Sequence, residues 1–119
     1  MNARRAARPD AQALQQMRAH ACEASGLLKA MGNEQRLLIL CQLVAGEASV
    51  GELLAQSELG QSALSQHLAV LREAELVQTR RVGPSVRYSL PRGPVHAIMQ
   101  ALHAIYCGSE RAGGNGAQA

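Results

Sequence analysis

The chain has 119 residues, of which 47% are hydrophobic and 2% aromatic, and its formal net charge is +3. This length suits one domain with a modest core, and no apolar run reaches the roughly 20 residues that a membrane-spanning helix needs. Three cysteines without close spacing do not form a secreted disulfide framework, and residues 1–10 lack the apolar core of a secretory signal, so we expect a cytoplasmic protein.

The N-terminal part of the chain begins with a basic segment and continues as a long helix. Residues 1–9 lack apolar periodicity, which predicts a disordered arm, and its basic side chains are Arg4, Arg5 and Arg8. Asp10 can cap a helix over 11–31. Apolar side chains recur along this helix at steps of three and four: Leu14, Met17, Ala21, Ala24, Leu28 and Met31. Such a seam favours a dimer contact, and packing within one subunit is the alternative.

Two shorter helices are expected next. Asn33 can cap a helix over 34–45. We expect the inner face of this helix to bury Cys41 together with four apolar side chains, Leu37, Leu38, Val44 and Ala45. Ser49 and Glu52 have the spacing of a capping box, which predicts a short third helix.

The segment 59–72 is predicted to be a helix with an apolar side and a side of short hydrogen-bonding groups. The apolar side carries Leu64, Leu68 and Leu71, and the opposite side carries Gln61, Ser62, Ser65 and Gln66. Because the short helix before it completes a helix-turn-helix, we expect these four polar side chains to contact base edges in the major groove of DNA. A merely solvated helix is the alternative. His67 lies between the two sides, where we expect it to pack.

A β-hairpin is predicted after this helix. Residues 76–82 and 86–90 have the pattern of two strands, joined by the turn Gly83-Pro84-Ser85. Three arginines flank its tip: Arg80, Arg81 and Arg87. A ribbon beside a recognition helix can reach backbone phosphates or the minor groove, so we predict a DNA-binding wing, with a solvated hairpin as the alternative.

The last predicted helix covers residues 94–107. Its apolar side chains are Val95, Ile98, Met99, Leu102, Ile105 and Tyr106. Three of them are expected to join the seam of the first helix in a dimer interface: Ile98, Met99 and Leu102. His96, His103 and Cys107 share the flank of this stripe, with His103 one turn before Cys107.

The predicted architecture is mainly α with a small β-wing. In order it has a helix, a helix, a helix-turn-helix, a two-stranded wing and a final helix, which together make a dimeric winged helix-turn-helix. The domain organisation follows from this order. We expect a basic arm over 1–9, one DNA-binding and dimerisation domain over 10–107, and a disordered tail rich in glycine and alanine over 108–119.

This order of elements resembles the ArsR/SmtB family of winged-helix repressors. The resemblance covers roughly 27–107 and is carried by three stretches: NEQRLLILCQL, LGQSALSQHLAVLREAELV and TRRVGPSVRYSL. It implies a homodimer that binds double-stranded operator DNA and leaves it when an effector arrives. Within the family, Cys41 in RLLILC and Cys107 in HAIYC resemble the sensing pair of the persulfide-responsive, SqrR/BigR-like subgroup.

The subgroup resemblance implies that Cys41 and Cys107 sense reactive sulfur species by forming a covalent bridge. A thiolate is the reactive form, and a second thiol can resolve a persulfide into such a bridge. Cys41 lies on an apolar face and Cys107 at the negative end of a helix, so we expect modest activation, which a charged His103 would improve. A disulfide needs Cα atoms within about 7 Å; a wider spacing favours the tetrasulfide that the resemblance implies. Cys22 matches no sensing position and is expected to be exposed.

Other function classes remain open on these residues. The family's usual metal motifs are lacking, because residues 50–54 (VGELL) contain no cysteine and no acidic residue lies between His96 and His103, so we expect no metal and no cofactor. A metal- or arsenite-responsive repressor using Cys41, Cys107 and a histidine is the nearest alternative. A thiol redox enzyme is more remote without a C-x-x-C pair, and we expect no enzyme. The resemblance makes sulfide oxidation or detoxification genes the expected targets.

Overall fold

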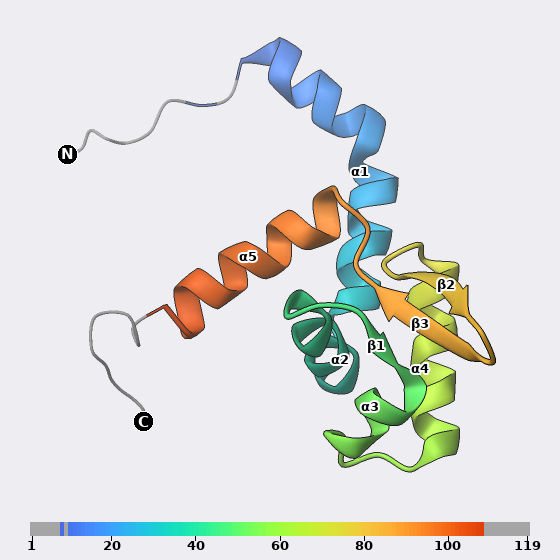
Figure 1. Ribbon diagram of the computed structural model, residues 1–119. Coiled ribbons are helices and arrows are strands. Elements are labelled where there is room, and N and C mark those ends of the chain that lie inside the picture. Colours follow the sequence, from blue (N-terminus) through green and yellow to red (C-terminus); the bar gives the residue numbers. More distant parts are fainter. Residues whose placement is uncertain (1–7, 9, 109–119) are drawn as a thin grey trace.

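The protein is mainly helical with a small antiparallel sheet, which confirms the predicted winged helix-turn-helix (Figure 1). This computed structural model describes Arg8 and residues 10–108. The elements are α1 (Ala11–Met31), α2 (Glu34–Val44), β1 (Ala48–Ser49), α3 (Val50–Ala55), α4 (Gln61–Glu73), β2 (Gln78–Val82), β3 (Ser85–Ser89) and α5 (Pro94–Tyr106).

Local hydrogen bonds begin three of the helices at the positions predicted from the sequence. The side chain of Asp10 accepts from the backbone N–H of Ala13 at 2.7 Å and begins α1. Asn33 does the same for α2. The capping box of α3 is complete, because Ser49 Oγ accepts from the Glu52 N–H at 3.1 Å and Glu52 Oε1 accepts from the Ser49 N–H at 2.9 Å. These bonds satisfy N–H groups that a helix start leaves free.

The core forms where α2, α3, α4 and the start of α5 meet. Its largest fully buried side chains are Ile39, Leu40, Leu53, Leu64, Leu71, Leu76 and Met99. The apolar side of α4 is as predicted, since Leu64, Leu68 and Leu71 are all buried. The exposed polar side of the same helix is therefore held in a fixed orientation by its buried side.

The inner face predicted for α2 is partly wrong. Leu38 is 52% exposed and Ala45 is exposed, whereas Ile39, Leu40 and Leu43 are buried. Leu37, Cys41 and Val44 are half-buried. The prediction failed because the segment LLILCQLV is apolar on nearly every side, so the helical period alone did not select a face. Packing of α2 against both α4 and α5 selects it in the structure.

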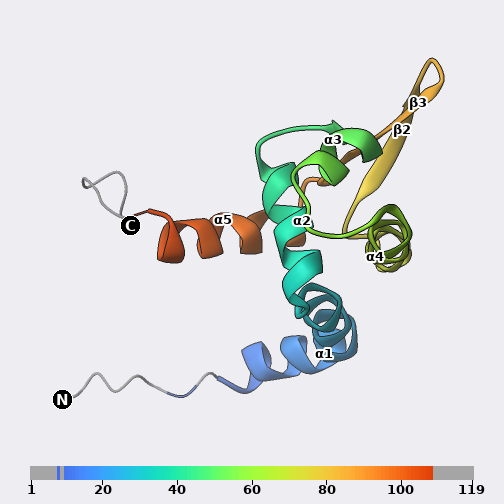
Figure 2. The ribbon, with the colours of Figure 1, turned by 90° about the horizontal axis from the view of Figure 1, so that it is seen from below.

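The sheet has a strand that the sequence did not indicate. Its order is β1-β3-β2, with the two-residue β1 pairing antiparallel to β3. The hairpin turn contains Gly83, whose φ of +60° is easily adopted by glycine. The first wing strand begins at Gln78 rather than Leu76, because Leu76 and Val77 are buried in the core before the strand starts. The hairpin projects away from α5 (Figure 2).

Both α1 and α5 extend beyond this core (Figure 1). Only Ala30 and Met31 of α1 are buried. None of the helices in the described part of the chain is long and apolar enough to cross a membrane. The arm predicted for 1–9, apart from Arg8, and the tail predicted for 108–119, apart from Gly108, lie outside the described residues.

A pair of substitutions in α2 tests the observed face of this helix. Leu40→Ala should lower the free energy of unfolding by about 2–5 kcal/mol, because it leaves a cavity at a side chain that is 0% exposed. Leu38→Ala is the matched control, and it should change the free energy by less than about 1 kcal/mol. Urea denaturation at one protein concentration measures both. Equal losses in the two variants would contradict the observed orientation of α2.

Candidate functional site

The predicted DNA-reading side chains lie together on the exposed side of α4. Gln61, Ser62, Ser65 and Gln66 are all exposed. His67 is half-buried, and its Nδ1 lies 3.4 Å from Nη1 of Arg36, which can donate to it. This contact joins α4 to α2 and agrees with the expectation that His67 packs. The side chains left free at the start of α4 are short donors and acceptors, which suit base edges in a major groove.

Two of the three wing arginines are engaged in ion pairs with carboxylates. Arg80 donates to Glu47 through both Nε, at 2.5 Å, and Nη2, at 3.0 Å. Arg87 Nε lies 3.4 Å from the same carboxylate, and Arg87 Nη2 donates to Glu52 at 3.2 Å. Both arginines are therefore paired with carboxylates in the structure, because β1 brings Glu47 and Glu52 to the hairpin, and their contact with DNA stays a prediction. Arg81 is exposed and makes no ion pair within the described residues.

The pKa values of the two carboxyl groups reflect these contacts. Hydrogen bonds from Arg80 are the main cause that lowers the pKa of Glu47 below its ordinary value, and the charges of Arg80 and Arg87 add to this effect. The backbone N–H of Ser49 is the main cause that lowers the pKa of Glu52, followed by the charge of Arg87. Both carboxyl groups are therefore ionised at neutral pH. The sequence indicates no function for Glu47, because its partners are more than thirty residues away.

A second cluster contains the predicted thiol pair. Cys41 in α2 and His103 in α5 are in contact, with 3.1 Å between Sγ and Nε2. The sequence placed His103 beside Cys107 and did not indicate this contact with Cys41. Burial is the main cause that raises the pKa of the Cys41 thiol, and the nearby Cys107 raises it further. Thus the Cys41 thiol of α2 contacts an imidazole of α5 that lies four residues before Cys107 in the sequence.

The three cysteines differ in exposure. Cys41 is half-buried, whereas Cys22 and Cys107 are exposed, and all three are free thiols. Cys22 was expected to be exposed, and the structure agrees. The burial predicted for Cys41 is incomplete because the end of α5 covers only part of its side chain.

The other candidate ligands do not join this cluster into a larger polar site. His96 is exposed on α5. Across residues 10–108, no group of three or more His, Cys, Asp or Glu side chains is arranged to hold a metal ion. The contact of Cys41 with His103 supports proton exchange between the thiol and the imidazole, and free thiols can form sulfur–sulfur bonds.

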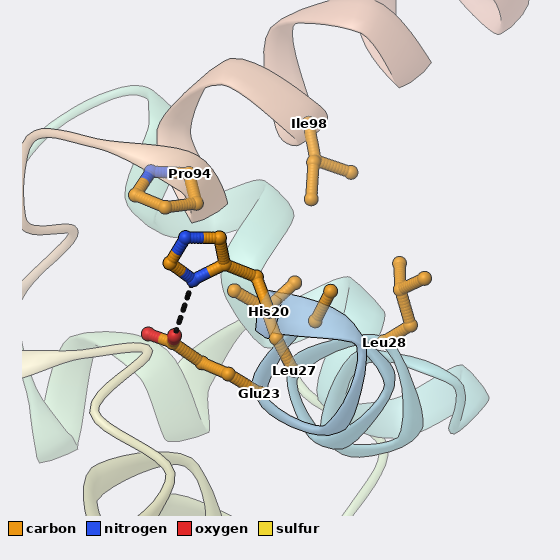
Figure 3. Close-up of a pocket in the computed structure, with 7 residues that line it drawn as sticks. His20, Glu23, Leu27, Leu28, Pro94 and Ile98 are labelled. Carbon is orange, nitrogen blue, oxygen red and sulfur yellow. Dashed lines mark ion pairs between the residues drawn. The ribbon is translucent and has the colours of Figure 1, made fainter. Parts of the chain in front are cut away.

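An apolar groove of about 410 Å³ lies between α1 and the start of α5. Figure 3 shows Leu27 and Leu28 of α1 facing Pro94 and Ile98 of α5, with His20 and Glu23 paired at one end. Of the predicted dimer contacts, Ala24, Leu28 and Ile98 line this groove. The other exposed or half-buried ones are not part of its lining: Leu14, Met17, Ala21 and Leu102. Met99 is an exception, because it is 2% exposed in the single chain and packs in its core.

Comparison with known proteins identifies the family to which this architecture belongs. A family model described as "Bacterial regulatory protein, arsR family" matches residues 33–79. The transcriptional activator HlyU of Vibrio cholerae is 52% identical over 94 residues, which span 79% of this chain and 87% of that protein. The structure of reduced HlyU from Vibrio cholerae has a TM-score of 0.73 at 52% identity, over 78% of this chain and 98% of that chain.

The transcriptional repressor BigR from Xylella fastidiosa is also similar in structure. Its crystal structure has a TM-score of 0.71 at 42% identity and covers 78% of this chain and 95% of the BigR chain. The family match extends from the Asn33 cap through α4 to the first residues of the wing, so it includes the whole helix-turn-helix. This chain therefore belongs to the arsR family of bacterial regulatory proteins, as a DNA-binding transcriptional regulator, not an enzyme, that is close to HlyU and BigR.

Proposed function

We propose that the protein is a dimeric repressor that senses persulfides and polysulfides through Cys41 and Cys107. The observation that carries this proposal is the contact of the Cys41 thiol with His103, which joins α2 to α5 one turn before Cys107, and Cys107 is near enough to raise the pKa of Cys41. In the reduced form the repressor binds operator DNA. A bridge between the thiols releases the DNA and allows transcription, with sulfide oxidation or detoxification genes as the targets that the subgroup resemblance implies.

DNA reading in this proposal follows the helix-turn-helix geometry. The exposed side of α4 presents Gln61, Ser62, Ser65 and Gln66 to base edges. The wing adds contacts to backbone phosphate or the minor groove. A dimer reads two half-sites about one helical turn apart, which doubles the contact area on the duplex.

The thiol chemistry balances with a polysulfide as the oxidant. Exposed Cys107, as the thiolate, attacks a sulfur next to one end of the polysulfide, retains the rest of the chain and displaces hydrosulfide. Cys41 then gives its proton to Nε2 of His103 and attacks the sulfur next to the free end of that chain, which expels a second hydrosulfide. The two thiols lose two protons and two electrons, and the polysulfide takes them up as two equivalents of hydrogen sulfide.

Bridging can affect DNA binding because α2 lies between the thiol cluster and α4. Leu40 and Leu43 of α2 are buried in the core that also holds Leu64 and Leu68 of α4. A covalent bridge between α2 and α5 changes the relative free energies of the positions that α2 can occupy. Release of DNA then requires that the bridged form have the lower affinity for the operator, which is a coupling free energy between the two sites.

Treatment with sodium polysulfide should bridge the two thiols and weaken DNA binding. Intact mass spectrometry should show added sulfur atoms and the loss of two hydrogens, and affinity for a duplex selected by the reduced protein should fall at least about tenfold, or about 1.4 kcal/mol. Cys41→Ser and Cys107→Ser should each abolish both changes. Cys22→Ser is the matched control and should behave like the wild type.

Parallel samples exposed to hydrogen peroxide and to divalent metal ions separate the alternatives. Polysulfide should act more strongly than peroxide. If no bridge forms and only a metal ion releases the DNA, the sulfur switch is wrong and the metal- or arsenite-responsive repressor takes its place.

The pH dependence of alkylation tests the environment of Cys41. Iodoacetamide reacts with the thiolate, so the midpoint of the rate profile reports the pKa. In the Cys22→Ser background, Cys41 should react with a midpoint above that of an ordinary cysteine, because burial and Cys107 raise its pKa. Adding Cys107→Ser removes one of these causes and should move the midpoint to lower pH. An unchanged midpoint would show that the two thiols do not interact electrostatically.

The homodimer rests on the exposed apolar side chains of α1 and α5. Leu28 lines the groove and is 55% exposed, and Leu38 on α2 is similarly exposed outside the groove. Leu28→Asp should therefore weaken dimerisation at least tenfold, about 1.4 kcal/mol, because it places a charge in the contact. Leu38→Asp is the control and should leave the dimer intact. Sedimentation equilibrium measures both, and the reverse order of effects would place the interface elsewhere.

A further inference from the structure

The three wing arginines have different partners, although the sequence treats them alike. We propose that the ion pairs of Glu47 and Glu52 with Arg80 and Arg87 act as braces, which fix the position of the wing on the domain. We propose also that Arg81 is the wing arginine that contacts DNA phosphate. This inference rests on the proposed binding of operator DNA and names the side chain that makes one of its contacts. Glu47 is a positioning residue in this arrangement.

Strand pairing assigns the arginines to opposite faces of the sheet. Arg80 lies directly opposite Arg87, and Arg87 lies opposite Ser49 of β1. These three residues therefore share one face. Arg81 and Tyr88 are each the next residue along their strands, so they belong to the other face. The hairpin thus separates Arg81 from the two arginines that are paired with carboxylates.

Two like charges directly opposite each other destabilise a strand pair unless they are compensated. Glu47 compensates Arg80 and Arg87 together, because its carboxylate contacts both guanidinium groups. Arg87 also reaches Glu52, whose carboxylate is fixed by the capping box at the start of α3. The wing is thereby tied to the helix-turn-helix by two carboxylates and two guanidinium groups, whose formal charges cancel.

The other face of the hairpin lies toward the recognition helix. Tyr88 lines a hollow of about 530 Å³ together with four residues of α4, Ser65, Ala69, Arg72 and Glu73. Ser65 belongs to the exposed polar side of α4, on which base contacts are proposed. The face of the sheet that carries Arg81 and Tyr88 therefore lies toward that polar side. The charge of Arg81 is not compensated by any ion pair among the described residues. Arg80 would have to leave a bidentate carboxylate pair before it could bind a phosphate.

Salt dependence of DNA binding distinguishes a phosphate contact from a brace. The measurement uses the reduced protein and a duplex that the wild type selects from a random-sequence pool. Each phosphate that the protein neutralises adds about 0.9 to the steepness of log K against log salt. Arg81→Ala should therefore reduce the slope by about one for each protomer. Arg80→Ala should keep the slope and lower the affinity by a similar factor at every salt concentration. Arg18→Ala on α1 removes the same charge far from the wing and is the control.

Glu47→Gln tests the positioning role directly. Without the carboxylate, Arg80 is released toward solvent and Arg87 keeps only its contact with Glu52. The slope should therefore become steeper than in the wild type, and amide hydrogen exchange in β2 and β3 should increase. Glu34→Gln, which removes an exposed carboxylate of α2, is the control and should change neither. Arg81→Ala should leave the hydrogen exchange of the wing unchanged, because this side chain makes no brace.

Three results would overturn the inference. The first is an equal reduction of the slope in Arg80→Ala and Arg81→Ala, and the second is an unchanged slope in Arg81→Ala. The third is a Glu47→Gln variant that behaves like Glu34→Gln in both measurements. None of these results concerns sulfur sensing, because only reduced protein is used. Failure of the wild type to select any duplex would overturn both the brace and the proposed operator binding.

Discussion

Burial of one face of α2 holds the functional parts of this regulator together. Ile39, Leu40 and Leu43 are buried in a core that also contains the apolar side of α4 and the first turns of α5. The half-buried Cys41 belongs to the same helix and contacts His103 of α5. Because protein interiors are close-packed, a displacement of α2 cannot be absorbed locally and must be shared with its neighbours. The helix that carries one thiol is therefore also the support of the recognition helix.

Ion pairs reduce the free positive charge of the wing, and the net charge of the chain does not show this reduction. A positive formal charge and clustered arginines fit a nucleic-acid partner. Within the wing, however, Glu47 and Glu52 already neutralise two guanidinium groups. Counting basic residues on a hairpin thus overstates the charge available to a phosphate backbone. The orientation of each side chain across the strand decides how much of that charge is free.

The sequence predicted most of the fold because its signals are local. Asp10, Asn33 and Ser49 act within one helical turn, and the two sides of α4 differ clearly in polarity. The site was predicted less completely because its contacts join distant segments. Neither the pairing of Glu47 with the wing nor the contact of Cys41 with His103 follows from spacing along one helix. The two-residue β1, which creates the first of these contacts, is too short to give a periodic signal.

The length of α1 has a consequence for its own helix–coil equilibrium. The helix has 21 residues, yet only Ala30 and Met31 are buried within the chain, and most of its first five turns are exposed. Helices that lack tertiary packing are only marginally stable in water, and their ends fray. The helical content of the N-terminal turns is thus expected to depend on whichever surface covers them. In the proposed dimer, order in this part of the molecule would depend on association and therefore on protein concentration.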